Sequence, residues 1–275
     1  MEKSNIDEKI KLLTGSGMWH TQEVEGLPSV HLSDGPHGLR KQEEKERQNN
    51  VSLVSTCYPT ASALACSWDV TAAERLGRAV AKEAWNADVA VLLGPGINMK
   101  RSPLCGRNFE YFSEDPFLAG RLGAAYVSAA QGENVAVSLK HFAANNQETN
   151  RQTANSQIDE RALREIYLSA FEYVVKTARP ATIMASYNRL NGYYACENRH
   201  LLTEILREEW GFDGVVISDW GACADLAKAV KAGMDLEMPD SHGIHARKLK
   251  AALKAGEISE EDIAKAAGRI EKLVK

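Results

Sequence analysis

Short apolar runs alternate with longer amphipathic stretches along the whole chain. The expected strands are, in chain order, residues 30–32, 62–65, 89–93, 135–139, 182–186, 215–218 and 234–236. The expected helices are 69–86, 114–131, 159–178, 198–209, 222–232, 242–255 and 259–274. Short strands that are each followed by a helix indicate βα units and a parallel sheet. The pattern therefore predicts an α/β fold.

The number of βα units decides which α/β fold is expected. About seven or eight units in one chain favour a closed (β/α)₈ TIM-like barrel over an open sheet. Runs such as VAVLL and GVVIS do not alternate with polar residues, as expected for parallel strands buried on both faces. Residues 33–60 have loop-like sequence where a helix would be due. We therefore expect residues 1–275 to form one barrel domain that is irregular around its first unit.

Charge, cysteine usage and hydropathy exclude several classes of function. The net charge is −4 and its signs are mixed along the chain, so no nucleic-acid partner is expected. The five cysteines are widely spaced and form no C-x-x-C pair, which favours reduced thiols over a disulfide framework or a zinc knuckle. No segment approaches the ~20 apolar residues of a membrane helix, and the first residues lack the apolar run of a signal peptide. We therefore expect a cytoplasmic protein that does not enter a membrane.

Polar residues follow several of the expected strands directly. They are Asp34, the pair Lys140-His141, Tyr187 and Asp219. In (β/α)₈ barrels the loops that carry the chemistry gather at the carboxyl ends of the strands. This placement predicts a polar pocket at that end of the barrel.

Asp219 is the candidate nucleophile of this pocket. Cationic side chains in other post-strand segments are expected around it: Arg107, Lys140, His141 and Arg151. Nearby cations lower the pKa of a carboxyl by about 1–3 units and keep it ionised. Alternatively, Asp219 is the N-cap of a helix that begins near Ala222. Trp220 either offers an apolar platform to a sugar ring or is a core residue.

The remaining candidates also have two interpretations each. Asp34 follows a strand in SDGPHGLR, where Gly35 and Pro36 favour a tight turn, and it either binds polyol hydroxyls or stabilises only its own loop. Lys140 either donates to hydroxyls together with His141 or acts as a Schiff-base amine. Three further charged residues either face the pocket or form structural ion pairs in loops, namely Arg107, Glu110 and Arg151.

Five ordered motifs carry a family resemblance: SDGPHGLR, GRNFEYFSEDPFLAG, SLKHFAANNQETNR, IMASYNRLNG and GVVISDWGA. In this order they resemble the family 3 glycoside hydrolases, especially bacterial β-glucosidases, over essentially the whole chain. The resemblance implies the family's N-terminal (β/α)₈-like barrel and makes Asp219 the catalytic nucleophile. It also implies a −1 subsite in which hydroxyls are bound by Asp34, Arg107, Lys140, His141 and Arg151, with Tyr187 near the nucleophile and Met184 and Trp220 on the apolar side.

The reaction implied by this resemblance is retaining hydrolysis of terminal, non-reducing β-D-glucosyl residues. The substrate would be a β-glucoside or a short β-glucan oligosaccharide, and neither a metal nor another cofactor is implied. Such chemistry needs a second carboxyl group that acts as acid and then as base. In these β-glucosidases it comes from a second α/β sandwich domain, which we expect to be absent from this chain.

The sequence nominates no replacement for that carboxyl group. Single-barrel hexosaminidases of this family use an Asp-x-His arrangement in a mobile loop, and the loop after His141 contains none. Glu110, Glu148 and Glu237 lie in plausible loops, but their context singles out none of them. We therefore expect weak or incomplete hydrolysis by the chain alone. An exposed apolar face would favour self-association or docking of a second domain.

Two other function classes stay open at this point. The first is an inactive barrel that binds sugar or serves as an isolated scaffold. The second is an aldolase-like barrel that forms an imine on Lys140. A 2-fluoroglucoside adduct on Asp219 favours the hydrolase, borohydride trapping on Lys140 favours the aldolase, and glucose protection without an adduct favours the binding barrel.

Overall fold

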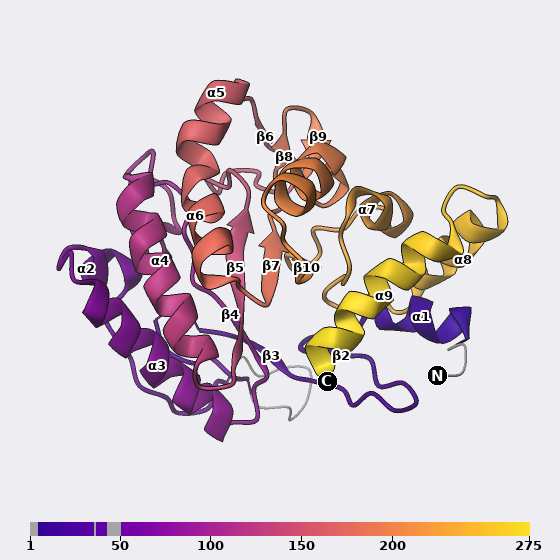
Figure 1. The fold of residues 1–275 in the computed structure, drawn as a ribbon, viewed down its shortest axis with the longest axis horizontal. Helices are drawn as coiled ribbons and strands as arrows, with labels where there is room; N and C mark the ends of the chain where they lie inside the picture. The colour runs from indigo at the N-terminus through magenta and orange to yellow at the C-terminus, as the bar shows by residue number, and fades with distance from the viewer. Residues whose placement is uncertain (1–4, 36, 43–50) are drawn as a thin grey trace. The chain divides into compact units, whose positions relative to one another are not determined.

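The computed structural model describes residues 5–35, 37–42 and 51–275 (Figure 1). By their internal contacts these residues divide into two compact units. Unit 1 consists of Met1–Val30, Asn150–Ile158 and Ala181–Lys275, and unit 2 consists of His31–Thr149 and Asp159–Pro180. A single domain over residues 1–275 stays a prediction, and each unit is described by itself.

Unit 2 contains three parallel strands. These are β3 (Leu32–Asp34), β4 (Val91–Leu93) and β5 (Ala136–Phe142). Leu32 pairs with Val91, and Val91 pairs with Ala136, so the three strands run in register. The expected strands at 30–32, 89–93 and 135–139 are thus present with shifted bounds. Because the strands are parallel, their carboxyl ends lie at the same edge of the sheet. The polar residues Asp34, Lys140 and His141 are therefore carried to that edge.

The helices of unit 2 pack beside these strands. They are α2 (Ala61–Ala65), α3 (Val70–Asn86), η1 (Asn108–Glu110), α4 (Pro116–Gln131), α5 (Glu160–Ala162), η2 (Leu163–Tyr167) and α6 (Ser169–Ala178). Helix α4 lies between α3 and α6 (Figure 1). A Cβ at Gly77 of α3 would lie only 2.5 Å from the carbonyl oxygen of Tyr126 in α4. Glycine therefore permits the close approach of these two helices.

The prediction of a strand at 62–65 is wrong, because these residues form helix α2. The Thr60 hydroxyl accepts a hydrogen bond from the Ala63 N–H and caps the helix. Three of its five residues are alanines, which have the highest helix propensity. A short apolar run cannot be assigned to strand or helix by periodicity alone.

Unit 1 contains the second group of strands. The parallel pair β7 (Thr182–Ala185) and β10 (Val215–Ser218) agrees with the strands expected at 182–186 and 215–218. Five two-residue strands complete the unit: β1 (Gly15–Ser16), β2 (His20–Thr21), β6 (Asn155–Ser156), β8 (Arg189–Leu190) and β9 (Tyr193–Tyr194). The strand expected at 234–236 is reduced to an isolated bridge between Leu236 and Ile217.

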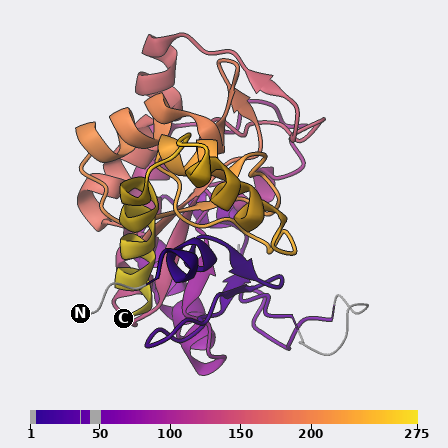
Figure 2. The same cartoon turned by 90° about the vertical axis from the view of Figure 1, so that its right-hand side faces the viewer.

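The helices of unit 1 are α1 (Ile6–Leu12), η3 (Ala195–Glu197), η4 (His200–Glu209), α7 (Leu226–Ala232), α8 (Ile244–Lys254) and α9 (Glu260–Val274). The last two of these end the chain. Helices α1 and α9 lie side by side in both views (Figure 1, Figure 2). The fully buried Asp235 accepts hydrogen bonds from Arg207 of η4, Arg269 of α9 and the backbone N–H of Val216. This carboxylate ties two helices to strand β10.

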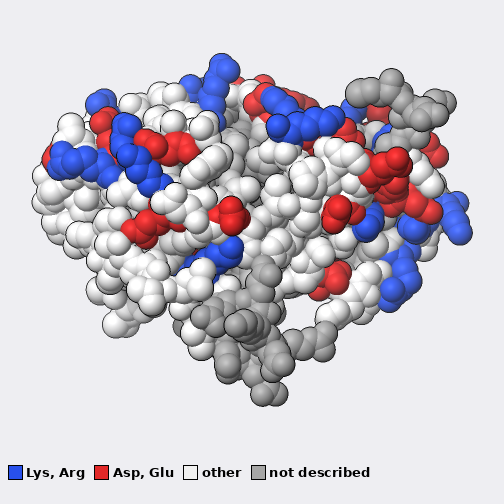
Figure 3. All heavy atoms as spheres, turned by 90° about the horizontal axis from the view of Figure 1, so that it is seen from below, with Lys and Arg blue, Asp and Glu red and all other residues white. Residues whose placement is uncertain are grey.

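The surface agrees with the mixed charge of the sequence. Lys and Arg side chains are interspersed with Asp and Glu on the face shown in Figure 3. Within the described part of the chain, no helix combines the length and the hydropathy needed to cross a membrane.

Candidate active site

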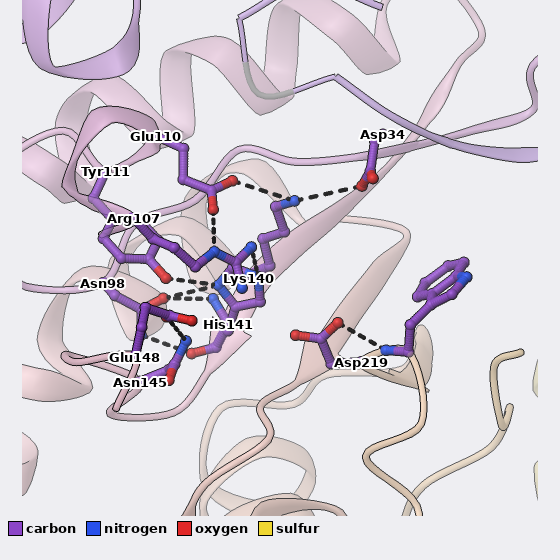
Figure 4. A network of polar contacts seen from close by, with 11 residues as sticks. Asp34, Asn98, Arg107, Glu110, Tyr111, Lys140, His141, Asn145, Glu148 and Asp219 are labelled. Atoms are coloured by element: carbon purple, nitrogen blue, oxygen red, sulfur yellow. Dashed lines mark hydrogen bonds and ion pairs between the residues drawn. The ribbon is translucent and has the colours of Figure 1, made fainter. Parts of the chain in front are cut away.

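Lys140 is the centre of a charged cluster at the strand ends of unit 2. Its Nζ lies 3.5 Å from Glu110 Oε2 and 3.9 Å from Asp34 Oδ1 (Figure 4). Lys140 and Glu110 are both 3% exposed, whereas the Asp34 side chain is 33% exposed. The Asp34 carboxylate therefore has a partner on another strand, so it does not serve its own loop alone. Pro36, in the predicted turn, lies outside the described residues.

Arg107 and His141 extend this cluster. Arg107 Nη2 lies 2.7 Å from His141 Nε2, and the Tyr111 hydroxyl lies 3.0 Å from His141 Nδ1. The Asn98 side chain accepts from the His141 N–H at 2.7 Å and donates to the His141 carbonyl at 2.8 Å. The imidazole is fully buried. Strand β5 and its neighbours thus fix both the backbone and the ring of His141.

Glu110 is an ionised carboxylate in this cluster. Burial acts to raise the pKa of its side chain, but Lys140 and Arg107 together hold that pKa below the usual value. Arg107 Nε donates to Glu110 Oε1, so for these two residues the alternative of an ion pair between loop residues is present in the structure. An ionised glutamate held by two cations is poorly suited to donate a proton. This argues against Glu110 as a general acid.

Asp219 stands at the carboxyl end of β10 in unit 1 and is 6% exposed. Its backbone N–H donates to Ala185 O of β7, and its carbonyl accepts from the Ala222 N–H, both at 2.9 Å. The Trp220 N–H donates to Asp219 Oδ1 at 2.8 Å (Figure 4). The alternative that Asp219 caps the next helix is wrong, because α7 begins at Leu226 and its N-cap is Asp225.

Aromatic side chains surround the loop that follows Asp219. The Tyr187 hydroxyl donates to the Trp220 carbonyl at 3.0 Å, and the Arg151 guanidinium lies 4.3 Å from the centre of the Tyr187 ring. The Trp220 indole N–H donates to Met18 O, and its ring lies 5.3 Å from that of Trp19. Trp220 is thus held from both ends rather than packed as an ordinary core residue.

The comparisons with known proteins identify the family of this chain. The model of the glycosyl hydrolase family 3 N-terminal domain matches residues 36–273. The chain belongs to glycosyl hydrolase family 3. The TIM-like (β/α)₈ α/β fold predicted from the sequence is the fold of this domain and is confirmed.

The chain is similar to several family 3 proteins over nearly its full length. It is 51% identical to thermostable beta-glucosidase B of Acetivibrio thermocellus, over 100% of this chain and 37% of that protein. It is also 51% identical to an exo-alpha-(1->6)-L-arabinopyranosidase of Bifidobacterium longum, over 86% of this chain and 32% of that protein. The chain thus spans about a third of these relatives.

Two solved family 3 structures give the same result for the fold. A beta-glucosidase of Bifidobacterium adolescentis superposes with a TM-score of 0.93 at 47% identity, over 99% of this chain and 39% of that one. Beta-glucosidase 3B of Thermotoga neapolitana in complex with glucose gives 0.93 at 39% identity, over 98% of this chain and 41% of that one.

Each unit of this family 3 domain brings together part of the predicted site. Asp34, Arg107, Lys140 and His141 form the charged cluster of unit 2, and Arg151, Tyr187, Asp219 and Trp220 lie together in unit 1. Met184 is buried in β7, in register with Ile217 of β10. Its contact with a sugar stays a prediction.

Sequence reasoning missed three residues of these clusters. Asn98 follows β4, so the rule that polar residues after strands mark the site could have found it. Tyr111 lies beside Glu110 in the motif GRNFEYFSEDPFLAG, and nothing in that motif indicates that the tyrosine hydroxyl contacts His141. Trp19 lies far from any long strand and carries no local signal.

Proposed function

We propose that this family 3 domain carries the nucleophile and the −1 subsite of a glycoside hydrolase that acts on terminal β-D-glucosyl residues. The observation that carries the proposal is the placement of Asp219. It is a nearly buried carboxylate at the tip of a parallel strand, oriented by the Trp220 N–H and not used as a helix cap. Strand tips are where (β/α)₈ barrels carry their catalytic groups.

In the proposed first step, an Asp219 carboxylate oxygen attacks the anomeric carbon of the sugar. The bond from that carbon to the aglycone oxygen breaks, and the aglycone leaves with the bonding electron pair. A water molecule then attacks the anomeric carbon of the glycosyl ester, the carboxylate is released, and the proton lost by the water replaces the one that the departed aglycone anion takes from solvent. Two inversions at one carbon retain the anomeric configuration.

The charged cluster of unit 2 is suited to binding sugar hydroxyls. The Asp34 carboxylate can accept hydrogen bonds from two hydroxyls, while Lys140 and Arg107 can donate to hydroxyl oxygens. Both ring nitrogens of His141 already have protein partners, so His141 contributes by orienting Arg107. Arg151 adds a further donor, and Trp220 offers an apolar face to the C–H groups of the ring. The supporting observation is that Arg107, Lys140 and His141 are already fixed by protein contacts.

We further propose that the 275 residues do not themselves supply the acid/base carboxyl. Glu110 is held ionised by two cations, Glu148 accepts from Asn145, and Glu237 pairs with His245. A general acid is worth about 10²–10⁴-fold. The chain alone should therefore cleave aryl β-glucosides with acidic phenols far faster than alkyl β-glucosides. Equal rates on both substrates would overturn this part of the proposal.

A second candidate substrate is an α-L-arabinopyranoside. It is favoured by the arabinopyranosidase relative, which has the same 51% identity as the thermostable beta-glucosidase, over 86% rather than 100% of this chain. Both sugars are pyranoses, and they differ in ring substituents that the −1 subsite must tell apart. Comparing kcat/KM for the nitrophenyl β-D-glucoside and the nitrophenyl α-L-arabinopyranoside tests the choice of glucose. A higher value for the arabinopyranoside would overturn it.

The other function classes have less support. An imine-forming lysine must present a neutral amine, whereas Lys140 lies between two carboxylates in the arrangement of an ion pair. A barrel that only binds sugar would show glucose protection in a melting experiment and no turnover of activated glucosides. Self-association through an exposed apolar face stays a prediction, which light scattering at high protein concentration tests.

A further inference from the structure

Three potential metal ligands converge in unit 1, outside the clusters described above. They are Cys223 in the loop after β10, Glu237 after the bridge at Leu236, and His245 in the first turn of α8. The Cys223 Sγ, a Glu237 carboxylate oxygen and an imidazole nitrogen of His245 all lie within 4.8 Å of one another. In the described ranges 5–35, 37–42 and 51–275, this is the one group of three such residues with this spacing.

We propose that these three residues form a binding site for a zinc-like divalent metal ion. Zn²⁺ binds thiolate sulfur at about 2.3 Å and imidazole nitrogen or carboxylate oxygen at about 2.0–2.2 Å in tetrahedral geometry. Ligand atoms around one such ion therefore lie roughly 3.3–3.8 Å apart, which the observed spacing allows with small side-chain movements. Thiolate and imidazole ligands select zinc over magnesium or calcium.

The surroundings of the three residues favour a real site over a chance surface cluster. Cys223 is 5% exposed and Glu237 is 3% exposed, while the His245 side chain is 17% exposed and leaves a route for the ion. The Glu237 backbone N–H donates to Leu13 O at 2.9 Å, so the segment that carries this ligand is anchored. Three protein ligands leave the fourth position for water.

The contacts of the ligands define what the ion must replace. His245 Nδ1 is hydrogen-bonded to Glu237 Oε1, and the Ser241 hydroxyl lies 3.5 Å from Glu237 Oε2. On binding, the ion takes the place of the proton between His245 Nδ1 and the Glu237 carboxylate. The imidazole is then neutral with its proton on Nε2, and any further proton passes to the buffer. The Cys223 thiol releases its proton to the buffer and binds as thiolate. A thiolate and a carboxylate then balance the two positive charges of the ion.

The site has a structural consequence because its ligands come from three separate segments. A bound ion would join the loop after β10 to the segment after Leu236 and to the first turn of α8. An ion that binds only the folded chain stabilises it by mass action. At a hundredfold excess over Kd, the melting temperature of a chain of this size should rise by roughly 5–10 °C.

The test uses Co²⁺ as a spectroscopic substitute for Zn²⁺, and it needs no measurement of hydrolysis. Titration of the full 275-residue chain with Co²⁺ should give a thiolate-to-cobalt charge-transfer absorption in the near ultraviolet, and Zn²⁺ should abolish it. The Cys223→Ser variant should lose this absorption. The matched control is Cys105→Ser, which changes a buried cysteine of unit 2 and should keep it.

A second variant keeps the test decisive if Cys223→Ser does not fold. His245→Asn changes a partly exposed side chain and should weaken Zn²⁺ binding by about tenfold or more in calorimetry, since even loss of a residue that only orients a ligand costs about 10–100-fold. At the same concentration, Zn²⁺ should raise the melting temperature of the unaltered chain by more than that of this variant. The proposal is overturned if Co²⁺ gives no charge-transfer absorption, or if His245→Asn binds Zn²⁺ as tightly as the unaltered chain.

Discussion

A hydrogen bond of 2.7 Å joins Arg107 Nη2 to His141 Nε2. A guanidinium group has only donors, so the imidazole nitrogen must accept. His141 therefore carries its proton on Nδ1, which faces the Tyr111 hydroxyl at 3.0 Å. The buried ring is thus fixed in one tautomer by residues on both sides.

Replacing Arg107 with lysine tests the importance of this hydrogen bond. Lysine keeps the charge but cannot bind Glu110 and His141 at the same time with a planar fork. Loss of one charged hydrogen bond costs about 1.5–3 kcal/mol, so kcat/KM for an aryl β-glucoside should fall by about 10–150-fold. The control is Arg161→Lys, an exposed helix residue paired with Glu165, which should keep full activity. Unchanged kcat/KM in Arg107→Lys would contradict the assigned role.

Glu110 should make the stability of the chain depend on acid pH. Its pKa is lower in the folded chain than its usual value of 4.5, so its contribution to stability is present above that value. The contribution is lost as the pH falls through the lowered folded-state pKa. Glu110→Gln should therefore be less stable at pH 7 and lose less stability on acidification. Urea unfolding at several pH values measures both effects.

The matched control for this prediction is Glu165→Gln, which removes an exposed carboxylate from a helix-surface pair. Its unfolding free energy should follow that of the unaltered chain at every pH. Equal acid sensitivity in Glu110→Gln and the unaltered chain would show that the Glu110 ion pairs do not stabilise the fold.

Asp235 should be one of the most sensitive positions for stability. Its fully buried carboxylate binds Arg207 and Arg269, whose side chains are only 13% and 24% exposed. Asp235→Ala leaves both guanidinium groups without their buried partner, and breaking a buried ion pair costs about 3–5 kcal/mol. Asp213→Ala breaks the exposed pair with Lys272 and should cost about 1 kcal/mol or less. Similar unfolding free energies for the two variants would refute this account of Asp235.

Tyr187→Phe tests whether the hydrogen bond from Tyr187 to the loop after Asp219 is needed for activity. The variant removes the hydrogen bond to the Trp220 carbonyl, which is worth about 1 kcal/mol. A similar loss of transition-state positioning would lower kcat about fivefold. Tyr193→Phe changes a tyrosine that is 67% exposed and should leave kcat unchanged. If both variants keep full kcat, the Tyr187 hydroxyl has no part in positioning the loop.

The strand tips could be predicted from the sequence because they depend on local pattern. The run VVIS forms β10 with the predicted bounds, 215–218, and Asp219 follows it directly. Lys140 and His141 likewise lie among the last residues of a buried, non-alternating strand. A continuous apolar run that ends in polar residues is sufficient for such a prediction.

The pairing of side chains could not be predicted because it depends on residues far apart in the chain. His141 is bound by Arg107 and Asn98, which are 34 and 43 positions away. Trp220 and Met18 are 202 positions apart. The prediction of a strand at 62–65 was wrong for a local reason, since the cap at Thr60 and helix-forming alanines outweighed the apolar pattern.

The measurement that tests the central claim most directly is mass spectrometry after incubation with an activated 2-deoxy-2-fluoroglucoside. The fluorine slows hydrolysis of the glycosyl ester, and the activated leaving group removes the need for a general acid. We expect one fluoroglucosyl group per chain, attached to the peptide that contains Asp219, and no labelling of Asp219→Asn. Labelling of another carboxylate, or equal labelling of Asp219→Asn, would contradict the assignment of Asp219 as the nucleophile.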